Sequence, residues 1–204
     1  MRYVMRGSIA LLVVAVFLSS GVWGQAPEAK TKATVGKPAP DFALKDLAGK
    51  EYKLSDCRAK SIVVLTWWSY KCPWSAGCDP YFTALAKDYG TKGVTLLAID
   101  SNNPTADPPD GIKAYCEKNK IAFPVLIDPG NKIADLYGAN QTPEVYVIDK
   151  QGVLVYHGAV DNRTKETEAG KEDYVRAALN AILDGKEVAK KETKAFGCTI
   201  KRAG

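Results

Sequence analysis

The sequence of 204 residues contains a single histidine, His157. A zinc site needs a cluster of cysteine and histidine at short, regular spacings, and the sequence has no such cluster. It also lacks a glycine-rich loop with the spacing that binds phosphate groups. We therefore expect neither a metal ion nor a bound cofactor.

Charge of either sign is moderate. The chain has 28 Lys and Arg against 23 Asp and Glu, a net charge of +5, which by itself does not indicate a nucleic-acid partner. With 46% hydrophobic and 25% charged residues, the composition excludes a disordered chain, a collagen and a coiled-coil array. The length fits one globular domain with short extensions.

Long apolar runs are scarce, and the clearest one lies at the N-terminus. Two arginines precede an uncharged, mostly apolar stretch over positions 8–20, and a small residue follows at Gly24. The apolar core is about a dozen residues, shorter than the roughly 20 of a membrane span. We therefore predict a secretory signal peptide over residues 1–24, then a flexible leader over 25–34. The protein would be exported, to the periplasm or another extracytoplasmic space, without a membrane anchor after cleavage; an uncleaved anchor is the alternative.

Strands and helices alternate along the rest of the chain. The apolar and turn patterns predict a hairpin of strands 42–44 and 52–54, buried strands 62–68, 94–99 and 125–127, a hairpin of strands 145–148 and 153–156, and helices 80–89, 110–119, 131–137 and 171–184. This order predicts an α/β domain over residues 35–185, with helices on both faces of the sheet and the first hairpin as an N-terminal extension. Residues 186–204 form a C-terminal tail.

Five cysteines are too few for a disulfide scaffold, and their odd number leaves at least one free thiol. Cys72 lies where a buried strand ends and a helix begins, the place where open α/β sheets bind ligands. A helix N-terminus and the neighbouring Lys71 both favour the thiolate, the nucleophilic form. We therefore predict Cys72 as a catalytic nucleophile; a buried, inert cysteine is the alternative.

Several segments resemble the thioredoxin-like redoxin family. Residues 63–73 resemble its strand and active-site turn, and residues 35–42 resemble the opening of peroxiredoxins and of the extracytoplasmic thioredoxins of cytochrome maturation. Residues 123–128 and 142–149 fit the same group. The resemblance covers residues 35–185 and implies a thioredoxin-like fold with a central mixed sheet. It also implies an exported oxidoreductase that acts on thiols, disulfides or peroxides.

The resemblance assigns a role to Thr142-Pro143. In such folds the matching proline follows a cis peptide bond and faces the active cysteine, here Cys72. Thr142 would offer its backbone groups to an extended substrate, and Pro73 and Trp74 would contact that substrate beside the nucleophile. Without the resemblance, an ordinary proline at the start of a strand is the simpler interpretation.

The chain departs from the family at its active turn. A dithiol thioredoxin has its second cysteine where this chain has Ser75. A peroxiredoxin has a Thr or Ser at the position of Ser69, which with Lys71 would tune the acidity of the thiol, but it has a proline where this chain has Leu65 and an arginine where it has Pro143. We therefore rank thiol–disulfide exchange first and a peroxiredoxin-like peroxidase second. A non-catalytic thioredoxin-fold binding module is third.

A mixed disulfide or sulfenic acid on Cys72 needs a second thiol to resolve it. Cys78 is one candidate. In a continuous helix it would rise about 9 Å above Cys72, beyond the roughly 7 Å limit between the Cα atoms of a disulfide. Gly77 and the pair Asp79-Pro80 indicate a break in the helix, and a break would allow a bridge.

Cys198 is the other candidate. It lies in an apolar island, residues 195–200, within a polar tail, and the tail resembles the ending of redoxin-like proteins with a lone active cysteine. We expect Phe196 and Ile200 to dock this island on the domain and to bring Cys198 to the nucleophile, while residues 188–194 stay undocked. The choice between the two cysteines stays open at this point.

The other chemically active side chains are expected to be structural. Cys116 lies on the apolar face of its helix, Cys57 stands where the family commonly has an aromatic residue, and His157 is expected to be a solvated residue at a strand end. Electrons would pass to or from a protein dithiol partner, and the substrate would be a peroxide or a protein disulfide. No nucleic-acid partner is expected.

Overall fold

The computed structural model describes residues 32–202. The predicted signal peptide and most of the predicted leader lie outside the described residues. Within residues 32–202, every helix is too short or too polar to cross a membrane.

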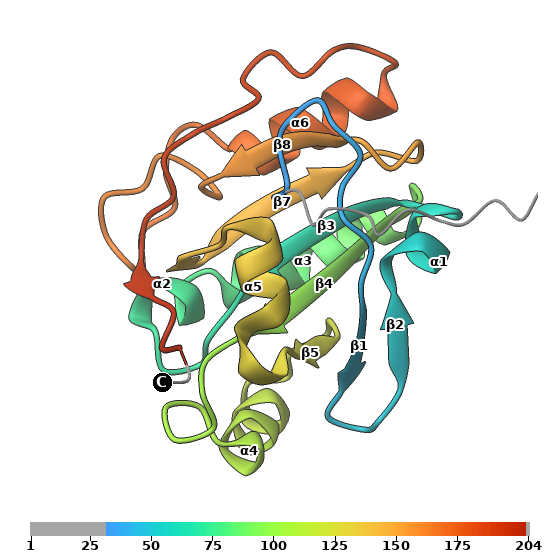
Figure 1. Ribbon diagram of the computed structural model, residues 1–204. Helices are drawn as coiled ribbons and strands as arrows, with labels where there is room; N and C mark the ends of the chain where they lie inside the picture. Colours follow the sequence, from blue (N-terminus) through green and yellow to red (C-terminus); the bar gives the residue numbers. More distant parts are fainter. Residues whose placement is uncertain (1–31, 203–204) are drawn as a thin grey trace, which may run out of the picture.

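A mixed seven-stranded sheet forms the centre of the domain (Figure 1). Its strands, in spatial order, are β2 (Glu51–Lys53), β1 (Ala43–Asp46), β5 (Val125–Ile127), β4 (Val94–Asp100), β3 (Ile62–Trp67), β7 (Glu144–Ile148) and β8 (Leu154–Gly158). The pairs β3–β4 and β4–β5 are parallel, and the pairs β1–β2, β1–β5, β3–β7 and β7–β8 are antiparallel. The expected mixed sheet is confirmed.

Helices cover both faces of the sheet (Figure 1). They are α1 (Leu54–Arg58), α2 (Pro73–Ala76), α3 (Asp79–Gly90), α4 (Pro109–Asn119), the 3₁₀ turn η1 (Pro129–Asn131), α5 (Lys132–Tyr137) and α6 (Tyr174–Leu183). Strand β3 is buried along its whole length, so its side chains alternate between two cores. Val64 packs in the core that contains residues of α3, α4 and α6, whereas Leu65 packs in the core that contains residues of α1 and α5. The predicted α/β class is thus confirmed.

Two element boundaries differ from the predictions for local reasons. The second strand of the first hairpin ends at Lys53, because Leu54 is fully buried and begins α1. The last helix begins at Tyr174 and not at residue 171. Asp173 caps it, since its carboxylate accepts a hydrogen bond from the Arg176 amide at 2.9 Å.

The tail lies against the domain along its whole described length (Figure 1). Val188 is 6% exposed, the His157 amide donates to the Lys191 carbonyl at 2.9 Å, and the Thr193 amide donates to the His157 carbonyl at 3.0 Å. These bonds cover the outer edge of β8, which would otherwise expose unpaired backbone groups. The prediction that residues 188–194 stay undocked is therefore wrong, because the buried Val188 side chain, backbone hydrogen bonds and the Thr193 hydroxyl, which accepts from the Ala159 amide at 2.9 Å, hold the segment.

The apolar island docks as predicted. Strand β9 (Cys198–Thr199) pairs antiparallel with β6 (Gln141–Thr142) in a separate two-stranded sheet. Ile200 is 4% exposed within the core that contains α1 and α5, and its amide donates to the Asn140 carbonyl at 3.0 Å. A single buried side chain thus anchors the end of the tail.

We predict that Ile200→Ala releases β9 while the domain stays folded. The variant loses most of the apolar contact that anchors the segment, worth about 1.5–3 kcal/mol, so amide exchange at residues 199–201 accelerates by about tenfold or more. Hydrogen exchange followed by mass spectrometry or NMR measures this. Thr199→Ala, at the neighbouring exposed position, is the control and leaves exchange unchanged. Equal protection in Ile200→Ala and the control would show that other contacts hold the tail.

Candidate active site

The turn after β3 presents Cys72 as the N-cap of α2. Pro73 begins the helix, and the Ala76 amide donates to the Cys72 carbonyl at 2.9 Å. The expected break in the helix is confirmed, because α2 has only four residues and Gly77 and Cys78 separate it from α3. A helix of one turn has only a small positive end near the thiol. The preference of Cys72 for the thiolate therefore stays a prediction.

The Cys72 thiol faces the segment before Pro143. Its Sγ donates to the Thr142 carbonyl at 2.9 Å, and the side chain is 3% exposed. The peptide bond between Thr142 and Pro143 is cis, as the resemblance implied. The sulfur-to-carbonyl hydrogen bond uses the thiol proton, so it belongs to the resting thiol and is lost when Cys72 acts as a thiolate.

Cys198 lies opposite Thr142 in the β6–β9 pair. Burial raises the pKa of Cys198 to about 12, and contact with the Cys72 thiol contributes a smaller part of this increase. All five cysteines of the chain are free thiols in this structure. The structure therefore brings the Cys198 thiol next to the Cys72 thiol, which itself contacts the Thr142 carbonyl.

Gly197 allows the tail to approach this closely. Its φ is +122°, a conformation that side chains disfavour, and a Cβ added there would lie 2.1 Å from the Thr142 carbonyl oxygen. Any larger residue would therefore push β9 away from β6. The sequence analysis missed this requirement, although a glycine directly before a cysteine in an otherwise polar tail is a visible signal.

Cys78 occupies a different environment. It is fully buried in the core that contains α3, and burial raises its pKa to about 12 despite the opposing effect of the Arg163 guanidinium. That guanidinium makes two hydrogen bonds of 2.8 Å to Asp161 and one of 3.4 Å to the Gly77 carbonyl. Cys78 therefore has no solvent access here, whereas Cys198 is partly exposed.

Two serines fix the active turn. The Ser69 hydroxyl donates to Asp107 Oδ2 at 2.6 Å, and the Ser69 carbonyl accepts from the Cys72 amide at 3.3 Å. Ser75, at the position of the second cysteine in dithiol turns, is fully buried and accepts from the Ser69 amide at 3.1 Å. Ser75 thus has a structural use, and Ser69 orients the backbone of the turn and does not contact the thiol.

The remaining predicted contacts divide between the turn and the tail. The Lys71 ammonium donates to the Ala106 carbonyl, which ties the turn to the loop before α4. Pro73 is exposed, while the Trp74 ring packs against Phe196 of the tail with ring centroids 5.1 Å apart. The side chain expected to contact substrate therefore contacts the tail in this structure.

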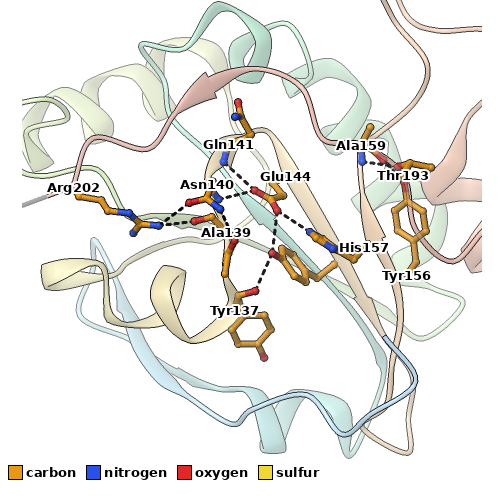
Figure 2. A network of polar contacts seen from close by, with 12 residues as sticks. Tyr137, Ala139, Asn140, Gln141, Glu144, Tyr156, His157, Ala159, Thr193 and Arg202 are labelled. Carbon is orange, nitrogen blue, oxygen red and sulfur yellow. Dashed lines mark hydrogen bonds and ion pairs between the residues drawn. The ribbon is translucent and has the colours of Figure 1, made fainter. Parts of the chain in front are cut away.

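A buried network around Glu144 holds the loop that carries Thr142 (Figure 2). Its carboxylate accepts hydrogen bonds from the Asn140 amide at 2.7 Å, the Gln141 amide at 2.9 Å, the Tyr146 hydroxyl at 3.1 Å and His157 Nε2 at 2.7 Å. Burial alone raises the pKa of Glu144, but these hydrogen bonds outweigh it and hold the pKa below its usual value.

His157 therefore belongs to this network. It lies near the end of β8 as expected, with its side chain 31% exposed, but its ring nitrogen is bound to Glu144 and does not only face solvent. Its ring also stacks on Tyr146, with centroids 4.3 Å apart. The sequence analysis missed Glu144 too. A charged residue at the start of a fully buried strand, directly after a proline, was the available signal.

Further buried carboxyl groups lie behind the turn. Burial raises the pKa of Asp100 to about 9, and the neighbouring Asp107 contributes a smaller part of this increase, so the Asp100 carboxyl keeps a proton at neutral pH. Asp128 accepts from the Ser101 hydroxyl at 2.7 Å. In residues 32–202, no three Asp, Glu, His or Cys side chains form a group that could hold a metal ion. Asp107 and Asp128 accept hydrogen bonds from serine hydroxyls of the segments that follow β3 and β4.

Comparison with known proteins identifies relatives of this arrangement. The pattern of the AhpC/TSA family matches residues 35–157. The thiol-disulfide oxidoreductase ResA of Geobacillus thermodenitrificans is 32% identical over 154 residues, which are 74% of this chain and 83% of the relative. The family match, residues 35–157, includes β6 and the active turn and ends before β9.

Two solved structures share the fold. The hypothetical protein SMc02350 from Sinorhizobium meliloti is 28% identical with a TM-score of 0.77, over 85% of this chain and 97% of that protein. An uncharacterized conserved protein from Geobacillus kaustophilus is 32% identical with a TM-score of 0.77, over 83% and 93% of the two chains. The predicted thioredoxin-like fold is confirmed, and the chain belongs to the AhpC/TSA family.

Proposed function

We propose that the protein is a thiol–disulfide oxidoreductase in which Cys72 is the nucleophile and Cys198 the resolving thiol. The oxidoreductase class predicted from the sequence is confirmed by the family and by the name shared by its relatives. The observation that carries the assignment of Cys198 is the β6–β9 pairing, which places this cysteine against Cys72. Complete burial of Cys78 argues against that residue as the resolving thiol.

Two exchange steps complete the reaction. In the first, the Cys72 thiolate attacks a substrate disulfide, forms a mixed disulfide with one half and releases the other half, which takes up a proton as a thiol. In the second, the Cys198 thiolate attacks the Cys72 sulfur, releases the bound half as a thiol and leaves a Cys72–Cys198 disulfide. Two electrons pass from the enzyme to the substrate, and a protein dithiol partner restores the two thiols by the reverse exchange.

Cellular location forms a second part of the proposal. Residues 1–24 have the three-part pattern of a secretory signal, and we propose that the mature protein begins at Gln25 in an extracytoplasmic, oxidising compartment. Mass spectrometry of the protein from the periplasmic fraction of its host tests this point. A chain that retains residues 1–24 in the cytoplasmic fraction would contradict it.

We predict that Cys198→Ser stops the reaction after its first step. With excess low-molecular-weight disulfide, the variant accumulates the mixed disulfide on Cys72, and multiple turnover falls by about two orders of magnitude because the intramolecular thiol is lost. Intact mass spectrometry detects the adduct. The Cys78→Ala variant distinguishes Cys198 from Cys78 as the resolving thiol, because we expect it to release the mixed disulfide on Cys72 as fast as the wild type does. An adduct that persists in Cys78→Ala and not in Cys198→Ser would reverse the assignment.

The rate of the second step is predicted to depend on pH. Because burial holds the pKa of Cys198 above its usual value, the attacking thiolate is a small fraction at neutral pH and its concentration rises with pH. Stopped-flow tryptophan fluorescence, with Trp74 close to the tail, follows the release of the bound half between pH 6 and 9. A rate that levels off below pH 8 would show that Cys198 is already a thiolate in the folded protein.

We also predict that hydrogen peroxide oxidises Cys72 more slowly than a disulfide does. Pro143 stands where a peroxidase of this family has its arginine, and the Arg163 guanidinium is already bound to Asp161 and to backbone carbonyls. Stopped-flow fluorescence with each oxidant measures both rates, and Cys72→Ser gives the background. A faster reaction with peroxide, lost in Cys72→Ser, would make the protein a peroxidase.

A further inference from the structure

An extended, cysteine-bearing segment already occupies the edge of the loop beside Cys72. It is the tail itself, whose β9 pairs with Gln141 and Thr142 through its backbone. With this segment in place Cys72 is 3% exposed. A disulfide within a partner protein therefore cannot reach the Cys72 sulfur until β9 leaves, because both segments need the same backbone edge and the same side of the sulfur.

We propose that β9 is an intramolecular occupant of the edge that Thr142 would offer to a substrate, and that this site prefers partner segments with an aromatic residue two positions before their cysteine. The proposal rests on the function proposed above and adds the class of its substrate. The tail and the partner would alternate: the partner displaces β9 to react with Cys72, and β9 returns with Cys198 to release it.

The preference for an aromatic residue comes from the position of Phe196. Its ring packs on Trp74 with centroids 5.1 Å apart, and the Arg163 guanidinium lies 5.9 Å from the centroid of the same ring. Trp74 comes from the active turn, and buried Arg163 is fixed by Asp161. An aromatic side chain thus fits between an indole ring and a cation, both of which favour contact with a π face.

The next position favours a small residue. Gly197 passes so close to Thr142 that a Cβ would lie 2.1 Å from its carbonyl oxygen. A partner segment in the same register meets the same carbonyl one residue before its cysteine. The expected sequence is therefore aromatic, small, cysteine, which is the order of residues 196–198 in the tail.

Gly197→Ala offers a way to open the site within the full chain. The substitution forces β9 away from Thr142 and leaves Cys72, Trp74 and the loop unchanged in sequence. It is combined with Cys198→Ser, so that the reaction stops at the mixed disulfide. The probe is a synthetic peptide with the sequence of residues 194–201, activated as a mixed disulfide with 2-mercaptoethanol, and a second peptide has alanine in place of the phenylalanine.

We expect three results from the rate at which Cys72 gains the peptide adduct. The opened variant reacts about tenfold or more faster than Cys198→Ser alone, since its tail no longer competes. In the opened variant, the phenylalanine peptide reacts about 3- to 10-fold faster than the alanine peptide. Trp74→Ala in the same background removes that difference, whereas the control Thr199→Ala does not open the site.

The outcomes separate this inference from the proposed function. Equal rates for the two peptides in the opened variant, or no acceleration by Gly197→Ala, would overturn the inference while exchange at Cys72 stands. Failure of Cys72 to react with any disulfide, the one from 2-mercaptoethanol included, would overturn the function itself. If Gly197→Ala does not fold by circular dichroism, Ile200→Ala opens the tail from the other side of Cys198 and serves the same comparison.

Discussion

The buried carboxylate of Glu144 fixes the part of the structure on which the site depends. Such a charge is costly to bury unless donors surround it, and four of them do so here. Two of these donors are the backbone amides of Asn140 and Gln141. A change in the conformation of the loop before Pro143 would break these two hydrogen bonds to a buried charge, which holds the loop in one conformation. In that loop the Thr142 carbonyl accepts a hydrogen bond from the Cys72 thiol, and the Asn140 carbonyl accepts one from the Ile200 amide. The nucleophile and the tail thus meet at a single, internally braced segment.

The same bracing reaches the tail from a second direction. The His157 side chain donates to Glu144, while its backbone bonds Lys191 and Thr193 on the edge of β8. Backbone pairing of β9 with β6 therefore positions Cys198. The Thr142 carbonyl of the same β6 strand accepts the hydrogen bond of the Cys72 thiol. With the tail in place Cys72 is buried, while Cys198 stays partly exposed. The reaction begins when the tail gives way to a substrate.

Local sequence signals were sufficient for the frame of the fold and for the position of Cys72 at the start of a helix after β3. The β-branched run of β3, the glycine that ends α3 and the cysteine at the polar exit of β3 all act through neighbouring residues. The pairing of β6 with β9 could not be predicted in the same way, because each strand has two residues and no periodicity. Docking of residues 188–194 was not predicted, because most of its contacts are backbone hydrogen bonds and bonds of the Thr193 hydroxyl, which an apolar pattern does not reveal. The contact between His157 and Glu144 was not predicted either, because it depends on the pairing of β7 with β8 in the folded sheet and not on local spacing.

Cys198, which the tail brings to Cys72, is the proposed redox partner of that cysteine. Non-reducing peptide mapping of the wild-type protein after mild oxidation shows which cysteine pairs with Cys72. We expect a peptide that joins the Cys72 turn to the tail around Cys198, with Cys57, Cys78 and Cys116 recovered as thiols. A bridge between Cys72 and Cys78, with Cys198 free, would contradict this assignment.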